Sequence, residues 1–306
     1  MNIKEFSEEY IAETAKLCRQ TLVNDIMPEF LLREKTVGDP DYDPALTYLS
    51  FDEKGEINGF IQGVIRERKD EKYGYIKLLC VAKDFRRKKI ATALYEQVEE
   101  KFNDSGVAVI RLGESYPNYF SPGIDPFYTE GICFFIQKGF KKFNDTANLL
   151  VDLTGQNFET TRDENQLKAK NIFIKRAEQK DKQKTLEWVA QSFDGWIPEV
   201  AEAFNTEPVS LFISGKAGTV WAFAAYEVNN KGTGWFGPMG TDIAARGNGI
   251  GEVLLKKCLA SMKNDGFTKA VIPWVGPIPF YMNTVNAKVN RVFWRYEKKL
   301  SENKGI

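Results

Sequence analysis

The stretch Arg246-Gly247-Asn248-Gly249-Ile250-Gly251 carries the most specific pattern in this sequence. It follows a short apolar run and opens an amphipathic segment, 250–263, whose apolar residues have helical spacing. Glycine lets the backbone approach a ligand closely, and free N–H groups at the start of a helix attract anions. The stretch therefore predicts a cradle for a phosphate or pyrophosphate group. The competing interpretation is a glycine-rich turn that only permits tight packing.

Two common phosphate-binding loops do not fit these residues. A dinucleotide-binding loop has the pattern G-x-G-x-x-G, whereas G-x-G-x-G is followed here by Glu252. The Walker pattern G-x-x-x-x-G-K-S/T is absent from the sequence. The spacing R-x-x-G-x-G, read from Arg246 through Gly249 to Gly251, instead resembles the pyrophosphate loop of the GNAT superfamily of N-acetyltransferases.

The two halves of the sequence repeat one order of segments. In the first half, helical patterns at 8–22 and 89–102 alternate with strand-like runs at 46–51, 57–66, 75–81 and 107–112. After a strand-like run at 172–175, the second half has helical patterns at 183–193 and 250–263 and strand-like runs at 209–213, 219–228, 233–239 and 270–274. A constant offset aligns Val81 with Thr241, Arg86 with Arg246, Ala91 with Gly251 and Gly106 with Gly266.

We predict two domains, residues 1–153 and 171–306, joined by a polar linker at 154–170. The length of 306 residues is about twice that of a common domain. Strands that alternate with helices indicate an α/β class. GNAT domains have a similar order of segments, so the resemblance covers nearly the whole chain. It implies an α/β (α+β) fold in which each half forms a mixed, largely antiparallel sheet flanked by helices.

The resemblance also implies an acetyl-CoA site in the second half. The pyrophosphate would be bound by the segment Arg246, Gly247, Asn248, Gly249, Ile250 and Gly251. The strand ending at Met239 to Thr241, where the family forms a bulge, would receive the pantetheine arm and the thioester. Tyr281 matches the position of a family tyrosine that protonates the departing thiolate. A tyrosine among apolar residues is equally often a packing residue. Asn286 stands where the family often has glycine, and asparagine tolerates the left-handed conformation.

The equivalent residues of the first half depart from this pattern. Its loop is Arg86-Arg87-Lys88-Lys89-Ile90-Ala91, in which Lys89 replaces the central glycine, and Phe135 stands where the tyrosine would be. A phosphate site with basic side chains and a solvated helix start are both compatible with this loop. The aromatic, proline-rich segment 115–125 is similar to a loop of some bacterial small-molecule GNAT proteins; it would line a substrate pocket or cap the sheet. Whether this copy, with Val81 on its central strand, binds CoA or catalyses transfer stays open.

Composition excludes several kinds of chemistry. The sequence has no histidine, so histidine-based nucleophile systems and metal ligands are absent, and no metal is expected. The 42 basic and 42 acidic residues balance, which argues against nucleic acid as a partner. Four scattered cysteines and the lack of a signal peptide or a long apolar run indicate a cytoplasmic protein without membrane association.

The sequence thus predicts an acetyl-CoA-dependent N-acetyltransferase whose acceptor is a primary amine of a small molecule or peptide. Direct attack of the amine on the thioester would need a base, for which the candidates are Asp194, Glu199, Glu202, Glu227 and a water chain. Trp196 is a candidate acceptor contact, with core packing as the alternative. Two other functions remain: a non-catalytic acyl-CoA sensor or scaffold, and transfer of a longer acyl or an aminoacyl group. The sequence specifies neither the acceptor nor the oligomeric state.

Overall fold

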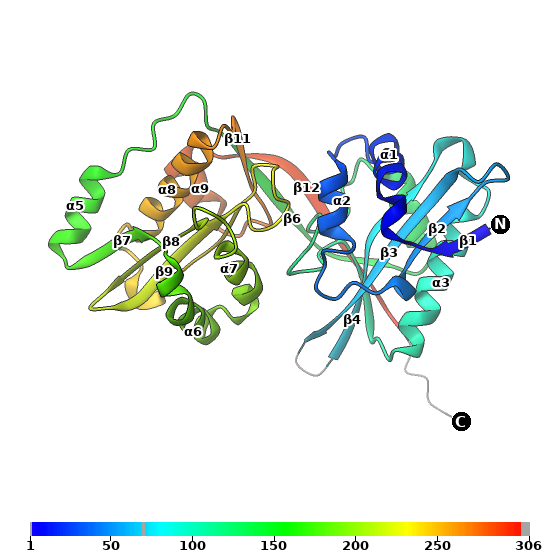
Figure 1. Cartoon of the computed structure of the whole chain (residues 1–306), viewed down its shortest axis with the longest axis horizontal. Helices are drawn as coiled ribbons and strands as arrows, with labels where there is room; N and C mark the ends of the chain where they lie inside the picture. Colours follow the sequence, from blue (N-terminus) through cyan, green and yellow to red (C-terminus); the bar gives the residue numbers. More distant parts are fainter. Residues whose placement is uncertain (1, 69–70, 301–306) are drawn as a thin grey trace. The chain divides into compact units, whose positions relative to one another are not determined.

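The computed structural model describes residues 2–68 and 71–300, which fold as two compact units (Figure 1). Unit 1 comprises Met1–Thr146 and Phe293–Ile306, and unit 2 comprises Ala147–Val292. Each unit is a mixed α/β structure with helices on both faces of its strands. None of the helices in the described part of the chain is both long and apolar enough to cross a bilayer. Each of the four cysteines is a free thiol.

Unit 1 is built on a sheet with the strand order β1-β2-β3-β4-β5-β12. The pairing of β4 with β5 is parallel, and the pairs β1–β2, β2–β3, β3–β4 and β5–β12 are antiparallel. The strands are β1 (Asn2–Glu5), β2 (Thr47–Phe51), β3 (Ile57–Arg68), β4 (Glu71–Val81), β5 (Val109–Leu112) and the end of β12 (Lys288–Lys299). The α-helices are α1 (Ile11–Thr21), α2 (Glu29–Lys35), α3 (Ile90–Asp104) and α4 (Thr129–Gln137).

The alternation of side chains along β3 explains why both faces of this sheet are covered. Phe60 packs in the core formed with α1 and α2, whereas its neighbour Ile61 packs in the core formed with α3 and α4. Both side chains are fully buried.

Unit 2 has the strand order β10-β9-β8-β7, all antiparallel, and a separate antiparallel pair between β11 and the end of β6. The strands are β6 (Lys141–Asp152), β7 (Ile172–Arg176), β8 (Leu211–Lys216), β9 (Thr219–Tyr226), β10 (Phe236–Thr241) and β11 (Lys269–Ile272). The α-helices are α5 (Thr161–Ala169), α6 (Lys182–Ser192), α7 (Ile197–Ala203), α8 (Ile250–Asn264) and α9 (Ile278–Val285). Short 3-10 helices are η1 (Glu8–Tyr10), η2 (Pro44–Leu46), η3 (Lys83–Phe85), η4 (Gln179–Asp181), η5 (Asp194–Trp196) and η6 (Ile243–Ala245).

The unit boundaries differ from those predicted at 153 and 171, because two long strands each contribute to both units. Residues 149–152 of β6 pair with β11 in unit 2, and Glu297–Lys299 of β12 pair with β5 in unit 1. Repetition in a sequence shows which segments correspond, but it does not show which strand completes which sheet.

The predicted linker at 154–170 also contains a helix, α5. Leu167 is its one buried residue, so no apolar periodicity marked it in the sequence. The ion pair between Glu164 and Lys257, at 2.9 Å, connects α5 to α8.

Both units contain a place where neighbouring strands separate. In unit 1, the pairing of β4 with β5 ends at Ile76 and Leu112, and β4 continues to Val81. In unit 2, β10 and β11 are connected through a single bridge, between Trp235 and Val271, and β10 continues to Thr241. Among the described residues, no strand pairs with the continuing part of β4 or of β10 on that side.

Each continuing strand also carries an irregularity at the same position of the repeat. In β4 the register shifts so that Lys77 is the extra residue between Ile76 and Leu78. In β10 the register shifts between Phe236 and Met239. A bulge re-aims the strand and its neighbouring groups, so both units turn the backbone next to the separated strands.

Lys77, at the bulge of unit 1, makes polar contacts with the end of α2 and the segment that follows it. Its fully buried ammonium donates to the Asp39 carboxylate and, at 2.6 Å, to the Lys35 carbonyl oxygen. Arg66 donates to both Asp39 oxygens at 2.7 Å. Burial lowers the pKa of Lys77 to about 7; Asp39 opposes this shift, and the like charges of Lys35 and Arg66 reinforce it. Burial acts to raise the pKa of Asp39, but the Lys77 and Arg66 charges lower it.

We predict that a fragment ending at residue 153 does not fold as a stable unit 1. It lacks the end of β12, so β5 loses a partner strand and the core loses Tyr296, which is buried there. Loss of one buried aromatic side chain costs about 3–5 kcal/mol, a large part of the stability of a domain. Thermal unfolding followed by circular dichroism tests this, with the same fragment joined by a flexible linker to residues 293–299 as the control. Equal, cooperative unfolding of both fragments would contradict the assignment of β12 to this sheet.

We predict that Lys77→Met changes how stability depends on pH. Between pH 7 and 9 the unfolded lysine keeps its proton while folded Lys77 has released it, so the free energy of unfolding of the wild type rises with pH. The variant lacks this contribution, so between pH 6 and pH 9 the wild type should gain roughly 2–3 kcal/mol relative to it. Urea unfolding at pH 6, 7, 8 and 9 measures the difference. The exposed Lys72, changed to Met, is the control, and parallel curves for wild type and Lys77→Met would refute the shift.

Candidate functional site

The glycine-rich segment of unit 2 forms an open turn at the start of α8. Gly247 has φ +79° and Gly249, the N-cap of the helix, has φ +81°, a conformation that favours glycine. A β-carbon added at either position would meet no atom within 4 Å, so this face of the turn is free of packed protein. The first residue of the helix, Ile250, is buried and anchors the turn to the core.

The first turn of α8 presents backbone N–H groups toward this open side. The N–H of Val253 donates to the Gly249 carbonyl at 3.2 Å, and the N–H groups of Ile250, Gly251 and Glu252 precede that first helical hydrogen bond. Together with the helix dipole, N–H groups in this position form an anion site.

The polar side chains of the turn stabilise its shape. Arg246 donates through Nε to the Thr241 carbonyl at 3.3 Å, and Asn248 donates to the Ala245 carbonyl at 3.1 Å. Lys170 donates to the Asn248 side-chain oxygen at 3.3 Å. The backbone of the turn is thus held in place by its own side chains.

The segments predicted to bind acetyl-CoA meet at Gly251. A β-carbon at this position would lie 3.5 Å from Met239 Cε, 3.6 Å from Thr241 Oγ1 and 3.6 Å from Phe280 Cζ. The start of α8, the end of β10 and the start of α9 therefore converge, although Met239 and Phe280 are separated by 41 positions in the chain. All three contacting side chains are half-buried, so this junction is not closed by the core.

Tyr281 lies next to this junction on α9. Its side chain is 7% exposed, and its ring packs edge-on against Phe280 and Phe236, with centroids 5.0 and 6.4 Å away. The hydroxyl makes no hydrogen bond to any residue within 2–68 or 71–300. Burial raises the pKa of Tyr281 to about 12, so the phenol keeps its proton at neutral pH. Helix α9 ends at Asn286, which adopts the left-handed conformation with φ +53°.

The carboxylates considered as bases stabilise surrounding loops. Glu227 accepts hydrogen bonds from the backbone N–H groups of Gly232 and Trp235. Glu202 pairs with Lys231 and accepts a hydrogen bond from Asn205. The exposed Asp194 caps its own loop at the N–H of Gly195. These contacts assign structural roles to three of the candidates and give no geometric reason to choose a base among them.

The corresponding turn of unit 1 has almost the same backbone without glycine. Arg87 has φ +61° and Lys89, the N-cap of α3, has φ +62°. Arg86 donates through Nε to the Val81 carbonyl at 3.4 Å, as Arg246 does to Thr241 in unit 2. Two residues with β-carbons therefore adopt left-handed conformations, at a cost of about 1–2 kcal/mol each.

Unit 1 has no phenol in the place of Tyr281. Phe135 is buried in α4, with its ring centroid 5.2 Å from Phe140 and 6.2 Å from Tyr95. The hydroxyl of Tyr95 donates to Glu99 at 2.6 Å. Unit 1 thus keeps the shape of the turn and lacks the predicted proton donor.

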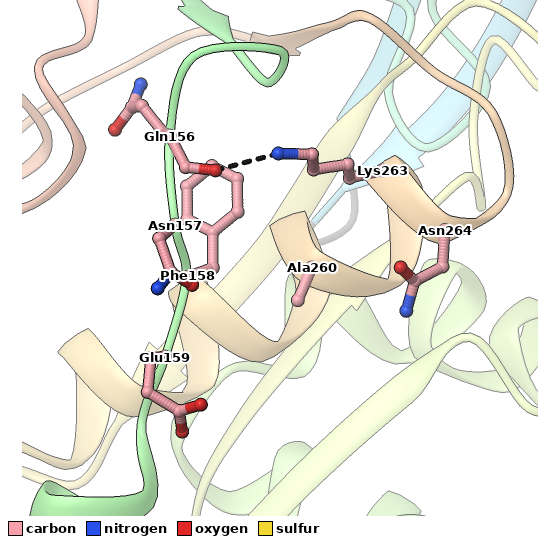
Figure 2. Close-up of a pocket in the computed structure, with 7 residues that line it drawn as sticks. All are labelled: Gln156, Asn157, Phe158, Glu159, Ala260, Lys263 and Asn264. Atoms are coloured by element: carbon pink, nitrogen blue, oxygen red, sulfur yellow. Dashed lines mark hydrogen bonds between the residues drawn. The ribbon is translucent and has the colours of Figure 1, made fainter.

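Unit 2 has a cavity of 330 Å³ at a distance from the glycine-rich turn (Figure 2). It is lined by Gln156, Asn157, Phe158, Glu159, Ala260, Lys263 and Asn264. Lys263 donates to the Gln156 carbonyl at 2.8 Å, so its charge already stabilises the segment that crosses the helix. The part of the lining that comes from α8 lies at the C-terminal end of this helix, about 20 Å along its axis from Gly249. This cavity is therefore separate from the predicted site. Within the described residues, no cluster of three or more His, Cys, Asp or Glu side chains has a metal-binding arrangement.

Comparison with solved structures identifies proteins of the same fold. A glucosamine N-acetyltransferase region of a fungal multi-domain β-N-acetylglucosaminidase superposes with a TM-score of 0.82 at 19% identity; the match covers 97% of this chain and 38% of the fungal one. A GCN5-related N-acetyltransferase from Sphaerobacter thermophilus superposes with a TM-score of 0.72 at 15% identity; the match covers 97% of this chain and 95% of the other. A tandem GNAT protein from the clavulanic acid biosynthesis pathway gives 0.68 at 12% identity, with 99% of both chains covered.

These identities establish the likeness of fold alone, and the chain spans about two fifths of the fungal protein. Comparison with curated protein sequences gives no match. The sequence itself matches one family description twice, over residues 12–122 and 174–280, which together make up more than half of the chain. This protein therefore belongs to the Acetyltransferase (GNAT) family, with one copy of the domain in each half.

Proposed function

We propose that this protein transfers an acetyl group from acetyl-CoA to a primary amine of a small molecule or peptide, and that the reaction takes place in unit 2. The observation that carries the proposal is the open start of α8 beside the end of β10. There, left-handed Gly247 and Gly249 precede the first N–H groups of α8, which make no hydrogen bond within the helix, and a β-carbon at Gly251 would lie within 4 Å of Met239 and Thr241. This arrangement can bind a pyrophosphate at one end and a thioester at the other.

The donor would be bound largely by backbone groups. The N–H groups of Ile250 and Gly251, with the helix dipole, would bind the pyrophosphate. Beyond the bridge at Trp235, β10 has no partner in β11, so its end is available to the pantetheine arm and the thioester. Backbone N–H groups near Met239 to Thr241 would stabilise the oxyanion that forms when the carbonyl is attacked.

The transfer step is a direct displacement. The acceptor must first lose a proton, because an alkylammonium has a pKa near ~10; water takes this proton in our proposal. The amine nitrogen then forms a bond to the acetyl carbon, the C–S bond breaks, and the CoA thiolate receives the proton of the Tyr281 hydroxyl. The surplus proton on the new amide nitrogen passes to water, and water returns a proton to the Tyr281 phenolate. With a pKa of about 12, raised by burial, the Tyr281 phenol still carries its proton at the pH at which the amine is deprotonated.

Unit 1 supports a different contribution. Its turn retains the left-handed backbone at Arg87 and Lys89, but Phe135 cannot donate a proton. We infer that unit 1 binds acyl-CoA or stabilises the protein without catalysing transfer.

The length of the acyl group that the protein transfers is tested by comparing the rates with acetyl-CoA and with longer acyl-CoAs. The acceptor panel should include hexosamines, because the fungal region of the same fold is a glucosamine N-acetyltransferase.

We predict that Gly249→Glu weakens acetyl-CoA binding at least about 100-fold, because a carboxylate at the helix start repels the pyrophosphate. Isothermal titration calorimetry measures the affinity, and circular dichroism checks the fold. Gly249→Lys adds a side chain without the negative charge, so its affinity shows how much of the loss comes from backbone strain. Lysine is chosen because Lys89 has the same left-handed conformation in unit 1. Lys89→Glu is the matched variant for unit 1. Unchanged affinity in Gly249→Glu would refute the placement of the pyrophosphate.

We predict that Tyr281→Phe lowers kcat about 100-fold and leaves the affinity for acetyl-CoA unchanged, because it removes only the proton donor. Thiol release measures turnover. Since the pKa of Tyr281 is about 12, the variant should keep the shape of the wild-type rate profile below pH 10. Tyr226→Phe is the control, because Tyr226 is a buried tyrosine of the same unit that accepts a hydrogen bond from Arg176. Wild-type turnover in Tyr281→Phe would exclude this residue from the mechanism.

A further inference from the structure

Three buried hydrogen-bond donors in unit 1 lack an acceptor. They are the hydroxyl of Tyr75, Nη2 of Arg68 and Nε of Arg111, and none of them makes a hydrogen bond to a residue of the structurally described part of the chain. Tyr75 is fully buried, whereas the other atoms of Arg68 and Arg111 are partly exposed. Buried polar groups almost always have a partner, so three donors without one indicate a missing ligand or water.

The three donors lie on one face of neighbouring strands. Arg68 is on β3 and Tyr75 on β4 (Figure 1), with the guanidinium carbon 5.5 Å from the centre of the tyrosine ring. Tyr75 is paired in register with Arg111 on β5. Ile76, the next residue of β4, points to the other face and packs in the core formed with α3 and α4. Three strands therefore bring these donors to the same place.

One positive charge at this place is not neutralised. Arg111 pairs with Glu114 at 3.0 Å and with Glu297 at 3.2 Å. Arg68 makes no ion pair with any carboxylate in the described ranges of the chain. Burial raises the pKa of Tyr75, the Arg68 and Arg111 charges oppose this shift, and the Glu114 charge reinforces it. The phenol thus keeps its proton at neutral pH and can donate it.

A carboxylate satisfies this set of groups better than water or phosphate does. The N–H groups of arginine are donors only, whereas a water molecule that accepts from them must also place its own two hydrogens. A carboxylate has acceptor oxygens alone, in a plane that suits a guanidinium. Its single negative charge matches the one unpaired charge of Arg68. The half-buried rings of Tyr73 and Tyr116 lie beside Arg111 and Arg68, where they would contact the apolar part of the ligand.

This cluster is separate from the places where CoA and its acceptor would be bound. Tyr75 precedes Val81, the last residue of β4, by six residues, which is about 20 Å along an extended strand. It lies in the paired part of β4 and β5, before the two strands separate after Ile76. Helices α1 and α2 and the segment between them provide none of the three donors.

We propose that Arg68, Tyr75 and Arg111 form a binding site in unit 1 for the carboxylate of a small organic monoanion. The carboxylate oxygens accept hydrogen bonds from Nη2 of Arg68, Nε of Arg111 and the hydroxyl of Tyr75. The site is independent of acetyl transfer in unit 2, and it assigns a ligand to the half of the chain that lacks the predicted proton donor.

The first test uses benzoate as the probe, with benzamide as an uncharged analogue of the same shape. Isothermal titration calorimetry on the full chain, at constant ionic strength, should show saturable binding of benzoate. Its affinity should be at least about tenfold higher than the affinities for benzamide and inorganic phosphate, because only the planar monoanion makes charge-assisted bonds to all three donors. Equal affinities for benzoate and either of the other two compounds, or no benzoate binding, would overturn the proposal.

Tyr75→Phe separates the binding role of this tyrosine from its role in the core. The variant loses a hydroxyl that has no partner in the fold, so without ligand it should unfold at the wild-type temperature or above it. Its affinity for benzoate should fall at least about tenfold. Tyr48→Phe is the matched control, because the buried Tyr48 donates to the Ala45 carbonyl at 2.7 Å. This control should unfold at a lower temperature and keep the wild-type affinity for benzoate. Wild-type affinity in Tyr75→Phe would contradict the site.

Arg68→Gln removes the unpaired charge and should also lower the affinity for benzoate at least about tenfold. Arg68→Lys keeps the charge without the planar group and should restore only part of the loss. The exposed Arg162 of unit 2, changed to Gln, is the control. Saturating acetyl-CoA should leave benzoate binding unchanged. Displacement of benzoate by acetyl-CoA would place the anion at a pyrophosphate turn and overturn the proposal, as would wild-type affinity in Arg68→Gln.

Discussion

The structure depends on backbone groups that cannot be paired where two strands separate. In unit 2, β10 and β11 share one bridge at Trp235, and β10 continues to Thr241 without β11 beside it. The first turn of α8 adds N–H groups that no helical carbonyl can accept. Backbone polar groups need a partner, and here water or a ligand must supply it. The open turn and the side chains that converge at Gly251 lie beside this backbone, and the ring of Phe193 packs against Gly240.

The two units show that the backbone of the turn persists while its side chains change. Glycine occupies the left-handed positions 247 and 249 in unit 2, and Arg87 and Lys89 occupy them in unit 1. The strain at these two residues is offset by the rest of the unit, in which Ile90 is buried as Ile250 is. The side chains differ more than the conformation does, because Phe135 stands in unit 1 where Tyr281 was predicted to correspond in unit 2.

The bulges of the two units are supported in different ways. In unit 1, Lys77 at the bulge and Arg66 both pair with the buried carboxylate of Asp39. In unit 2 the corresponding strand has Gly237 at this place, and the rings of Phe193 and Phe223 pack against Gly240.

The sequence by itself determined the family, the repeat and the position of the turn, because these depend on local features: the spacing of Arg246, Gly249 and Gly251, the periodicity of the following helix and a constant offset between the halves. It did not reveal α5, whose polar residues carry a single buried side chain, or the hydrogen bonds of Glu227 and Glu202. Only the tertiary structure decided that β12 completes the sheet of unit 1 and that Phe193 packs on Gly240. Those contacts join residues far apart in the chain, and their energy comes from pairing and packing that no local pattern encodes.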